Sequence, residues 1–232
     1  MAAPQRPRPK AIVCDVNGTL VSLDPIGQRM KELGLTENDL ELWFAKVLRD
    51  GIAAAAADGF ATFSAFGGYH LKLMLCALGD KAPVDMEQAV DHVLEGFNQI
   101  APHGDLQPAF QRLTEAGIKV TSMTNGNAKF TNGFLQRNGL DKYVSLVLDV
   151  SAPRLWKPRK EAYVYVTDQL HLKPEEVMLV AIHPWDCNGA KNAGLQAAYV
   201  NRNNQPYPEF FATPDLSVQS FVELAEKLTS SS

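Results

Sequence analysis

Polar residues directly follow three apolar, strand-like runs of this 232-residue chain, and their side chains are the first candidates for chemistry. The three polar segments are Asp15-Val16-Asn17-Gly18-Thr19, Thr124-Asn125-Gly126 and His183-Pro184-Trp185-Asp186. A carboxylate at the end of a buried strand is costly unless it is paired or put to use. Asp15, which ends the run AIVCD, therefore needs either a partner or a function.

Alternating strand-like and helix-like segments would bring these three polar segments together. Strands are expected at 11–16, 118–123, 143–150, 175–182 and 195–200, and helices at 106–117, 127–139, 159–170, from 188 onward and at 218–228. Such alternation predicts an α/β fold with a parallel sheet that helices cover on both faces. Because ligands of these sheets bind beyond the carboxyl ends of the strands, the polar segments are expected to form one site.

A helical block interrupts this alternation after the first strand. A helix capped by Thr36 is predicted from an apolar stripe at helical spacing, and further helices are expected at 67–79 and 84–100. The stripe comprises Leu40, Trp43, Phe44, Val47 and Leu48. We therefore predict a disordered tail at 1–10, an α/β core made of 11–21 and 103–232, and an inserted helical cap domain at 22–102 that covers the site.

Composition narrows the classes of partner. The formal net charge of −4 and a pI near 5.7 argue against nucleic acids and anionic membranes. No apolar run approaches the ~20 residues that span a bilayer, and the first ten residues lack the apolar core of a secretory signal. Cys14, Cys76 and Cys187 are few and far apart, which favours a reducing, cytoplasmic compartment over a disulfide scaffold or a zinc site.

Each polar residue also has a purely structural interpretation. Asn-Gly between apolar residues is a strong hairpin signal, so the first segment could be a plain turn. By default Lys157 is a solvated lysine, Tyr163 a core residue, His183 a hydrogen-bonded loop residue and Asp186 a helix N-cap. The functional interpretation gains weight because the polar residues occupy successive strand ends.

Four motifs make the chain resemble a known family. They are IVCDVNGTL, MTNGN, LWKPRKEAY and HPWDCNGAKNAGLQAAYVNR. The sequence resembles the haloacid dehalogenase superfamily and, within it, the type II (S)-2-haloacid dehalogenase branch. The resemblance spans nearly the whole chain, and it implies a Rossmann-like core with an inserted helical cap.

The resemblance implies a catalytic role for three charged residues. Asp15 matches the family nucleophile, which attacks carbon or phosphorus to give a covalent aspartyl intermediate. Lys157 would place a positive charge beside it and keep it ionised. Asp186 would orient or activate the water that hydrolyses the ester intermediate.

The same resemblance implies substrate-binding roles for neighbouring polar residues. Thr19 and Thr124 would hold the carboxylate or the substrate through their hydroxyls, and Asn125 would donate to a substrate oxygen. Tyr163 would support the lysine or bind the substrate. The remaining candidates are Asn17 and His183, discussed next.

Asn17 and Ile182 separate this chain from the phosphatases of the family. Those enzymes have an acid at both positions, one to protonate the leaving alkoxide and one to bind magnesium. Asparagine cannot supply a proton, and isoleucine offers no oxygen to a magnesium ion. A halide leaves as an anion without an acid, so we expect metal-independent chemistry on carbon, with no cofactor and no bound metal.

The chain also departs from the dehalogenase branch. Phe44 follows Trp43 where that branch has its halide-binding arginine, and His183 replaces an asparagine. A halide would therefore have to bind elsewhere, with Asn17, Asn125 and His183 as candidates.

The expected function is hydrolytic dehalogenation of a small 2-haloalkanoic acid, so the expected partner is a small carboxylic acid. Two alternatives stay open, a hydrolase of another substrate such as a phosphate ester and a binding protein that has lost turnover. Dimers are common in this branch, so a homodimer is one expectation; an apolar face at Phe60, Phe63 and Phe66 could serve either the core or a partner.

Overall fold

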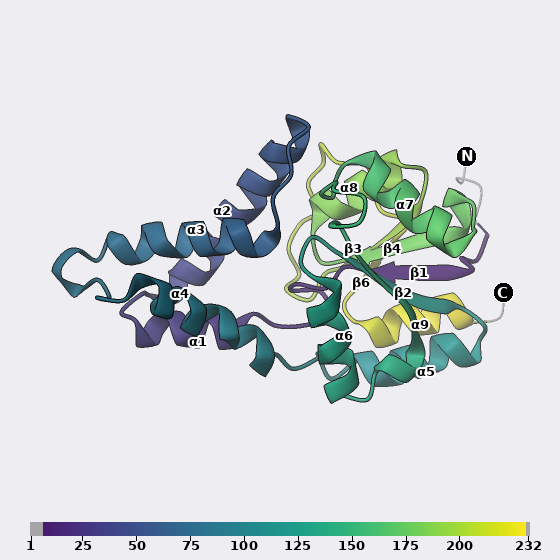
Figure 1. The fold of residues 1–232 in the computed structure, drawn as a ribbon. Helices are drawn as coiled ribbons and strands as arrows, with labels where there is room; N and C mark the ends of the chain where they lie inside the picture. The colour runs from purple at the N-terminus through teal and green to yellow at the C-terminus, as the bar shows by residue number, and fades with distance from the viewer. Residues whose placement is uncertain (1–6, 231–232) are drawn as a thin grey trace.

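The computed structural model describes residues 7–230, and within them parallel strands form one six-stranded sheet (Figure 1). The sheet order is β3-β2-β1-β4-β5-β6, which places β1 in the middle. The strands are β1 Ala11–Cys14, β2 Lys119–Thr124, β3 Val144–Asp149, β4 Val177–Ala181, β5 Gln196–Val200 and β6 Leu216–Val218. The predicted α/β class is confirmed.

Helices cover the two faces of this sheet. In Figure 1, α7 and α8 lie on one face and α5 and α9 on the other, as the apolar stripes of these helices require. The helices are α5 Leu106–Glu115, α6 Ala128–Arg137, α7 Lys160–Leu170, α8 Pro184–Asn192 and α9 Phe221–Thr229. Phe110 of α5 meets Phe221 of α9 edge to face, with ring centroids 5.9 Å apart. Strand β1 is fully buried between the two layers.

The strand register brings the three polar segments to one edge. Cys14, the last residue of β1, lies opposite Ser122 of β2 and Val180 of β4, and both pairings are parallel. The segments that follow these strands therefore leave the sheet side by side, as predicted. A hairpin at Asn17-Gly18 is excluded, because the neighbours of β1 are parallel strands from distant parts of the chain.

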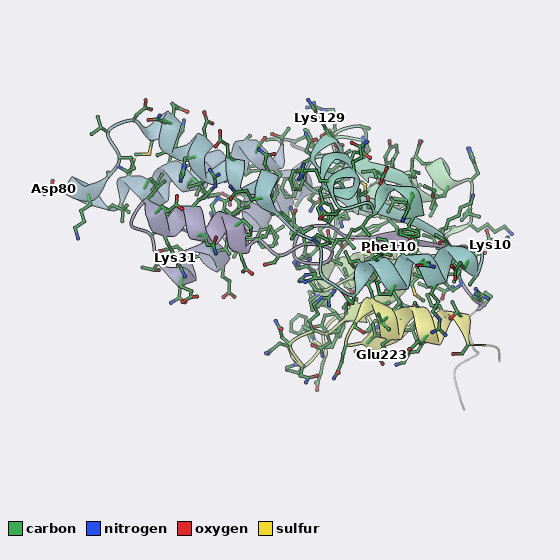
Figure 2. All side chains as sticks on the ribbon, turned by 90° about the horizontal axis from the view of Figure 1, so that it is seen from below. Lys10, Lys31, Asp80, Phe110, Lys129 and Glu223 are labelled. Carbon is green, nitrogen blue, oxygen red and sulfur yellow. The ribbon has the colours of Figure 1, made fainter. Side chains whose placement is uncertain are left out.

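The helical block between β1 and β2 extends away from the sheet (Figures 1 and 2). It contains α1 Asp24–Glu32, α2 Glu37–Ala56, α3 Phe63–Cys76 and α4 Met86–Leu94, followed by a 3₁₀ turn at Glu95–Gln99. Trp43 of α2 is buried and donates from Nε1 to Gly67 O of α3 at 2.9 Å. The domain boundaries at 21/22 and 102/103 stay a prediction.

The apolar face at Phe60, Phe63 and Phe66 packs within the chain. Phe63 stacks on Trp156, with ring centroids 6.3 Å apart, and Phe66 meets the same indole edge to face at 5.7 Å. Trp156 Nε1 donates to Ala61 O at 2.9 Å. These contacts fasten the start of α3 to the segment after β3, so this face serves the core; the homodimer stays a prediction.

The sequence analysis erred at several boundaries. It missed α1 and the three-residue strand β6, and α8 begins at Pro184 instead of 188. Residues 7–10 belong to the fold and not to a disordered tail, because Lys10 N donates to Glu176 O at 2.8 Å and Arg8 Nη2 to Ala116 O at 2.8 Å. The rest of that predicted tail, 1–6, lies outside the described residues.

In the described part of the chain, no helix combines the length and apolar character needed to cross a membrane. Cys14 and Cys187 are buried thiols and Cys76 is an exposed one.

Candidate active site

The Asp15 carboxylate lies just beyond β1 and is held by side chains from three parts of the chain. Its Oδ1 accepts from Lys157 Nζ at 3.0 Å, and its Oδ2 contacts Thr19 Oγ1 at 2.8 Å and His183 Nδ1 at 3.0 Å. Asp15 N donates to Val180 O of β4 at 3.0 Å, which fixes the backbone in line with the sheet. Asp15 is 5% exposed, so this carboxylate is buried but reachable.

A tight loop after Asp15 turns the Thr19 hydroxyl back onto it. Gly18 has φ +80°, and a Cβ there would lie 2.9 Å from Ile182 Cδ1. Only glycine adopts this backbone without strain. Thr19 Oγ1 also accepts from Ile182 N at 3.2 Å, which ties the loop to the end of β4.

Lys157 is fully buried and bridges two carboxylates. Its Nζ lies 3.0 Å from Asp15 Oδ1 and 2.6 Å from Asp186 Oδ2. The Asn125 amide clamps the lysine backbone: Lys157 N donates to Asn125 Oδ1 at 2.8 Å, and Asn125 Nδ2 donates to Lys157 O at 3.1 Å. The default of a solvated lysine is therefore wrong. Asn125 also lines the chamber beside Asp15 and has a second amide hydrogen, so its predicted use as a substrate donor stays a prediction.

Tyr163 acts on Asp186, not on the lysine. Tyr163 Oη donates to Asp186 Oδ1 at 2.6 Å, and both side chains are buried. A Cβ on Gly189 of α8 would lie 2.5 Å from that hydroxyl, so the glycine makes room for it. Tyr163 lines none of the cavities described around Asp15 and reaches Lys157 only through Asp186. Its predicted role, to support the lysine or bind the substrate, stays a prediction.

Opposing effects set the charges of this cluster. Burial alone would raise the pKa of Asp15, but the Lys157 charge and the His183 hydrogen bond hold it well below its ordinary value. Burial raises the pKa of Asp186, and the nearby Asp15 charge raises it further. The Lys157 charge lowers it but does not cancel these two effects. Burial opposes the charge of Lys157, yet its two carboxylate neighbours raise its pKa. Both shifts favour an anionic Asp15 beside a cationic Lys157.

A chamber of about 10 Å³ opens onto the Asp15 carboxylate. That volume holds about one water molecule. Its walls are formed by Asp15, Asn17, Phe44, Leu48, Phe63, Thr124, Asn125, His183 and Trp185. Thr124 ends β2, and its Oγ1 accepts from Gly126 N at 2.8 Å. Asn17 and Thr124 thus reach the predicted site.

A larger cavity of about 240 Å³, called the aromatic cavity after the three phenylalanines that line it, adjoins this chamber. It shares the walls Asn17, Phe63 and Thr124 with the chamber. Its other walls are Thr62, Ser64, Leu94, Phe97, Gly126, Asn127, Phe130 and Ser151. The cavity could therefore hold a group attached to a molecule that reacts at Asp15.

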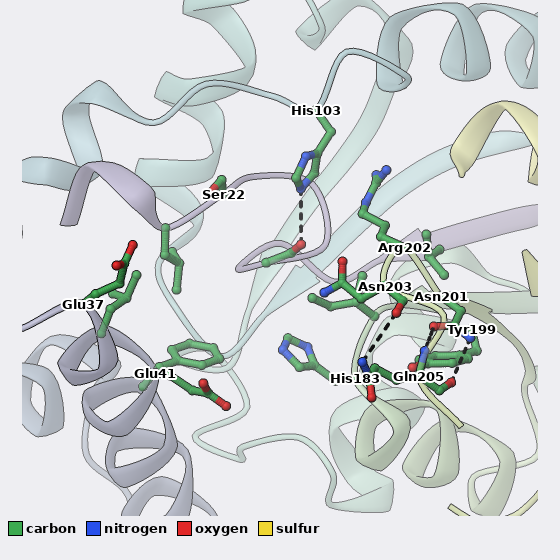
Figure 3. A pocket seen from close by; sticks show the side chains of 16 residues that line it. Ser22, Glu37, Glu41, His103, His183, Tyr199, Asn201, Arg202, Asn203 and Gln205 are labelled. Atoms are coloured by element: carbon green, nitrogen blue, oxygen red, sulfur yellow. Dashed lines mark hydrogen bonds between the residues drawn. The ribbon is translucent and has the colours of Figure 1, made fainter. Parts of the chain in front are cut away.

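An outer cleft of about 590 Å³ lies on the other side of His183 (Figure 3). Glu37 and Glu41 of α2 face it from the helical block, and Arg202 lines it from the loop after β5. Phe44 and His183, whose ring centroids are 5.9 Å apart, line both the cleft and the chamber. These two rings lie between the chamber at Asp15 and the more open cleft.

The sequence analysis predicted the polar residues but missed the aromatic walls. Phe63 and Trp185 line the chamber, and Phe97 and Phe130 line the larger cavity. An aromatic residue on an amphipathic helix is by default a core residue, so spacing gives no sign that it faces a cavity. For Trp185 the signal was its position between His183 and Asp186.

The fold and the site define an α/β protein in which a central carboxylate, held by a lysine, lies at the carboxyl ends of parallel strands and beneath a helical block. A family model for haloacid dehalogenase-like hydrolases matches residues 9–194. The chain belongs to the haloacid dehalogenase-like hydrolases.

Individual relatives cover almost the whole chain at low identity. (S)-2-haloacid dehalogenase 4A of Burkholderia cepacia is 26% identical over 228 residues, which are 93% of each protein. (S)-2-haloacid dehalogenase 1 of Pseudomonas sp. (strain CBS-3) is 24% identical over 221 residues, 94% of this chain and 96% of that protein. The structure of L-2-haloacid dehalogenase from Xanthobacter autotrophicus with chloropropionic acid covalently bound aligns with a TM-score of 0.87 at 22% identity, over 97% of this chain and 100% of that one. The structural likeness shows a shared fold.

Proposed function

We propose that this hydrolase cleaves the carbon–halogen bond of small 2-haloalkanoic acids without a metal, through an ester formed at Asp15. The observation that carries the proposal is the ionised Asp15 carboxylate, bound to Lys157 at 3.0 Å and facing a chamber that Asn17 also lines. The relatives named (S)-2-haloacid dehalogenase support the same chemistry.

In the first step, a lone pair of the Asp15 carboxylate attacks carbon 2 of the acid. A carbon–oxygen bond forms, the carbon–halogen bond breaks, and the halide leaves with the bonding electrons. No proton is needed, which agrees with an amide at position 17. Lys157 keeps the nucleophile ionised and offsets its repulsion by the substrate carboxylate.

Asn17 is the best candidate for the halide contact. Of the groups expected to bind the halide, Asn125 is engaged with the Lys157 backbone and His183 with Asp15. Asn17 lines the chamber together with the aromatic rings of Phe44 and Trp185. Its amide N–H group and the positive edges of those rings can both face a departing anion.

In the second step, water hydrolyses the ester and returns Asp15 to its carboxylate form. Asp186 was expected to orient or activate this water, but it is 0% exposed and its two oxygens bind Lys157 and Tyr163. We therefore assign Asp186 and Tyr163 to positioning: the tyrosine holds the carboxylate, and the carboxylate holds the ammonium group against Asp15.

The aromatic cavity accommodates the rest of the substrate. The chamber has room for only one small group beside Asp15, so the rest of the acid has to extend beyond Asn17, Phe63 and Thr124. A mainly apolar wall favours alkyl groups there. A small 2-haloalkanoate can react at the chamber and place its alkyl substituent in the aromatic cavity.

Halide release from a panel of acids tests the proposal. Chloro-, bromo- and fluoroacetate and the 2-halopropionates are incubated with the enzyme and with Asp15→Asn, without added metal. We expect halide from at least one acid with the natural enzyme and none with the variant.

Two other outcomes would support the competing functions. Turnover of p-nitrophenyl phosphate that requires magnesium would favour a phosphate ester hydrolase. Thermal stabilisation by small carboxylates, without halide release or a covalent adduct, would favour a binding protein.

A further inference from the structure

The two oxygens of the Asp15 carboxylate have different surroundings. Oδ2 is contacted by both Thr19 Oγ1, at 2.8 Å, and His183 Nδ1, at 3.0 Å. Within the described residues, Oδ1 is contacted by Lys157 Nζ alone, at 3.0 Å. Each carboxylate oxygen has two lone pairs. Both lone pairs of Oδ2 are therefore engaged, whereas Oδ1 keeps one that is available for attack.

Both contacts on Oδ2 are donations to the carboxylate. An ionised carboxylate only accepts hydrogen bonds, so the Nδ1 atom of His183 must carry a hydrogen. The Thr19 oxygen accepts from Ile182 N at 3.2 Å, which leaves its own hydrogen to point at Asp15.

Two aromatic rings pack near the His183 ring. It stacks on Trp185 with ring centroids 5.3 Å apart, and Phe44 lies at 5.9 Å. Two preset donors at 2.8 and 3.0 Å from one oxygen match the arrangement that stabilises the oxyanion of a tetrahedral intermediate.

We infer that Asp15 Oδ1 is the attacking oxygen and that Oδ2 becomes the ester carbonyl, with His183 and Thr19 as its oxyanion donors. This assignment rests on the proposed function. It makes His183 a catalytic residue of ester hydrolysis and not a ligand of the halide.

The hydrolysis step balances with these roles. Water oxygen bonds to Asp15 Cγ, and the carbonyl electron pair moves onto Oδ2, where the His183 and Thr19 hydrogens face it. The bond between Asp15 Cγ and Oδ1 then breaks, so the 2-hydroxy acid leaves with Oδ1 as its hydroxyl oxygen. One proton of the water ends on that alkoxide, and the other passes to solvent when the new Asp15 carboxyl ionises.

Paired variants of His183 and Thr19 separate the loss of a hydrogen-bond donor from a change in side-chain packing. His183→Phe keeps a ring without a donor, whereas His183→Asn keeps an N–H group near the place of Nδ1. Thr19→Val removes the hydroxyl at nearly constant volume, and Thr19→Ser retains it. Rapid-quench experiments measure the halide burst and the decay of the Asp15 adduct, the latter by intact-protein mass spectrometry.

We expect ester decay to slow by roughly 10²–10³-fold in His183→Phe and in Thr19→Val, the usual effect of losing one oxyanion donor. His183→Asn and Thr19→Ser should lose much less, and the halide burst should change by less than about tenfold, since Oδ1 and Lys157 are untouched. The adduct should therefore accumulate in the Phe and Val variants.

Several results would overturn the assignment. A halide burst that falls as far as ester decay would make His183 a halide ligand. An Asn variant as impaired as the Phe variant would make the ring itself, or its basicity, the important property. If the natural enzyme forms no adduct and releases no halide, the proposed function fails, and this assignment fails with it.

A second measurement needs no substrate. In ¹⁵N spectra of the histidine-labelled enzyme, recorded near pH 8 and assigned with His183→Asn, the Nδ1 atom of His183 should carry the proton. A resonance pair typical of a ring protonated only at Nε2 would contradict the donor role even if turnover is intact.

Discussion

Charged residues lie in two contrasting regions of the molecule, the ionic cluster beneath the chamber and the outer cleft beside it. In the cluster, Lys157 and Asp186 are 0% exposed, and a named partner contacts every charged group. In the cleft, Glu37 and Glu41 are exposed on the helical side (Figure 3). Desolvated charges are costly to separate and therefore fix geometry, whereas exposed charges contribute little and are screened by salt.

The largest effect is expected from Asp15→Asn, which removes the nucleophile from the cluster. Turnover should fall by at least about 10⁴-fold, because the remaining groups have no carboxylate with which to form the ester. Halide release measures the loss, and circular dichroism checks that the fold is retained. A variant with near-natural turnover would refute the covalent route.

Lys157→Met tests whether a buried charged residue contributes more to stability than an exposed one. It leaves Asp15 and Asp186 buried without their shared cation, so the free energy of unfolding at pH 7 should fall by about 3–5 kcal/mol. Lys10→Met is the matched control, because Lys10 is 63% exposed in its pair with Glu176 and its loss should cost less than about 1 kcal/mol. Denaturant titrations compare the two, and equal losses would contradict the contrast.

The deficit of Lys157→Met should shrink as the pH falls. In the natural enzyme the pKa of Asp15 is lowered, so its contribution to stability is present above the ordinary carboxyl pKa of 3.8 and is lost at lower pH. In the variant the carboxyls are no longer held ionised, and protonation relieves their burial. Unfolding at pH 4 and pH 7 should therefore give a smaller difference between variant and natural enzyme at pH 4.

Phe130→Trp sharpens the comparison between the chamber and the aromatic cavity. The larger ring fills part of the space assigned to the substituent on carbon 2. We expect kcat/KM for a 2-halobutyrate to fall by about tenfold or more, the scale on which a pocket senses a methylene group. Haloacetates, which carry no such substituent, are the internal control, and an equal loss for both would place the substituent elsewhere.

The smallest effect is expected in the outer cleft. Glu41→Gln removes an exposed negative charge from a route open to an anionic acid, so kcat/KM should rise by about twofold at low salt and converge with the natural enzyme at high salt. Glu115→Gln, an equal charge change on α5, should have no such effect. A salt-independent change of tenfold would make Glu41 part of the site.

The sequence predicted the fold more completely than it predicted the contacts within the site. Strand-helix alternation was enough to place the polar strand ends together, because parallel strands share one edge. The short β6 and the proline-containing α1 carry too few periodic residues for such a prediction. Buried strand ends identified Asp15, but the clamps of Asn125 on Lys157 and of Tyr163 on Asp186 depend on contacts across 32 and 23 residues of chain. Only the folded geometry pairs these side chains.

Isotope incorporation tests the covalent role of Asp15 most directly. The enzyme is allowed a single turnover of a 2-haloacid in water enriched in ¹⁸O, and the peptide that contains Asp15 is then weighed by mass spectrometry. We expect one heavy oxygen in Asp15 and none in the released 2-hydroxy acid. A labelled product together with an unlabelled Asp15 would mean that water attacks the substrate directly, and the account would fail.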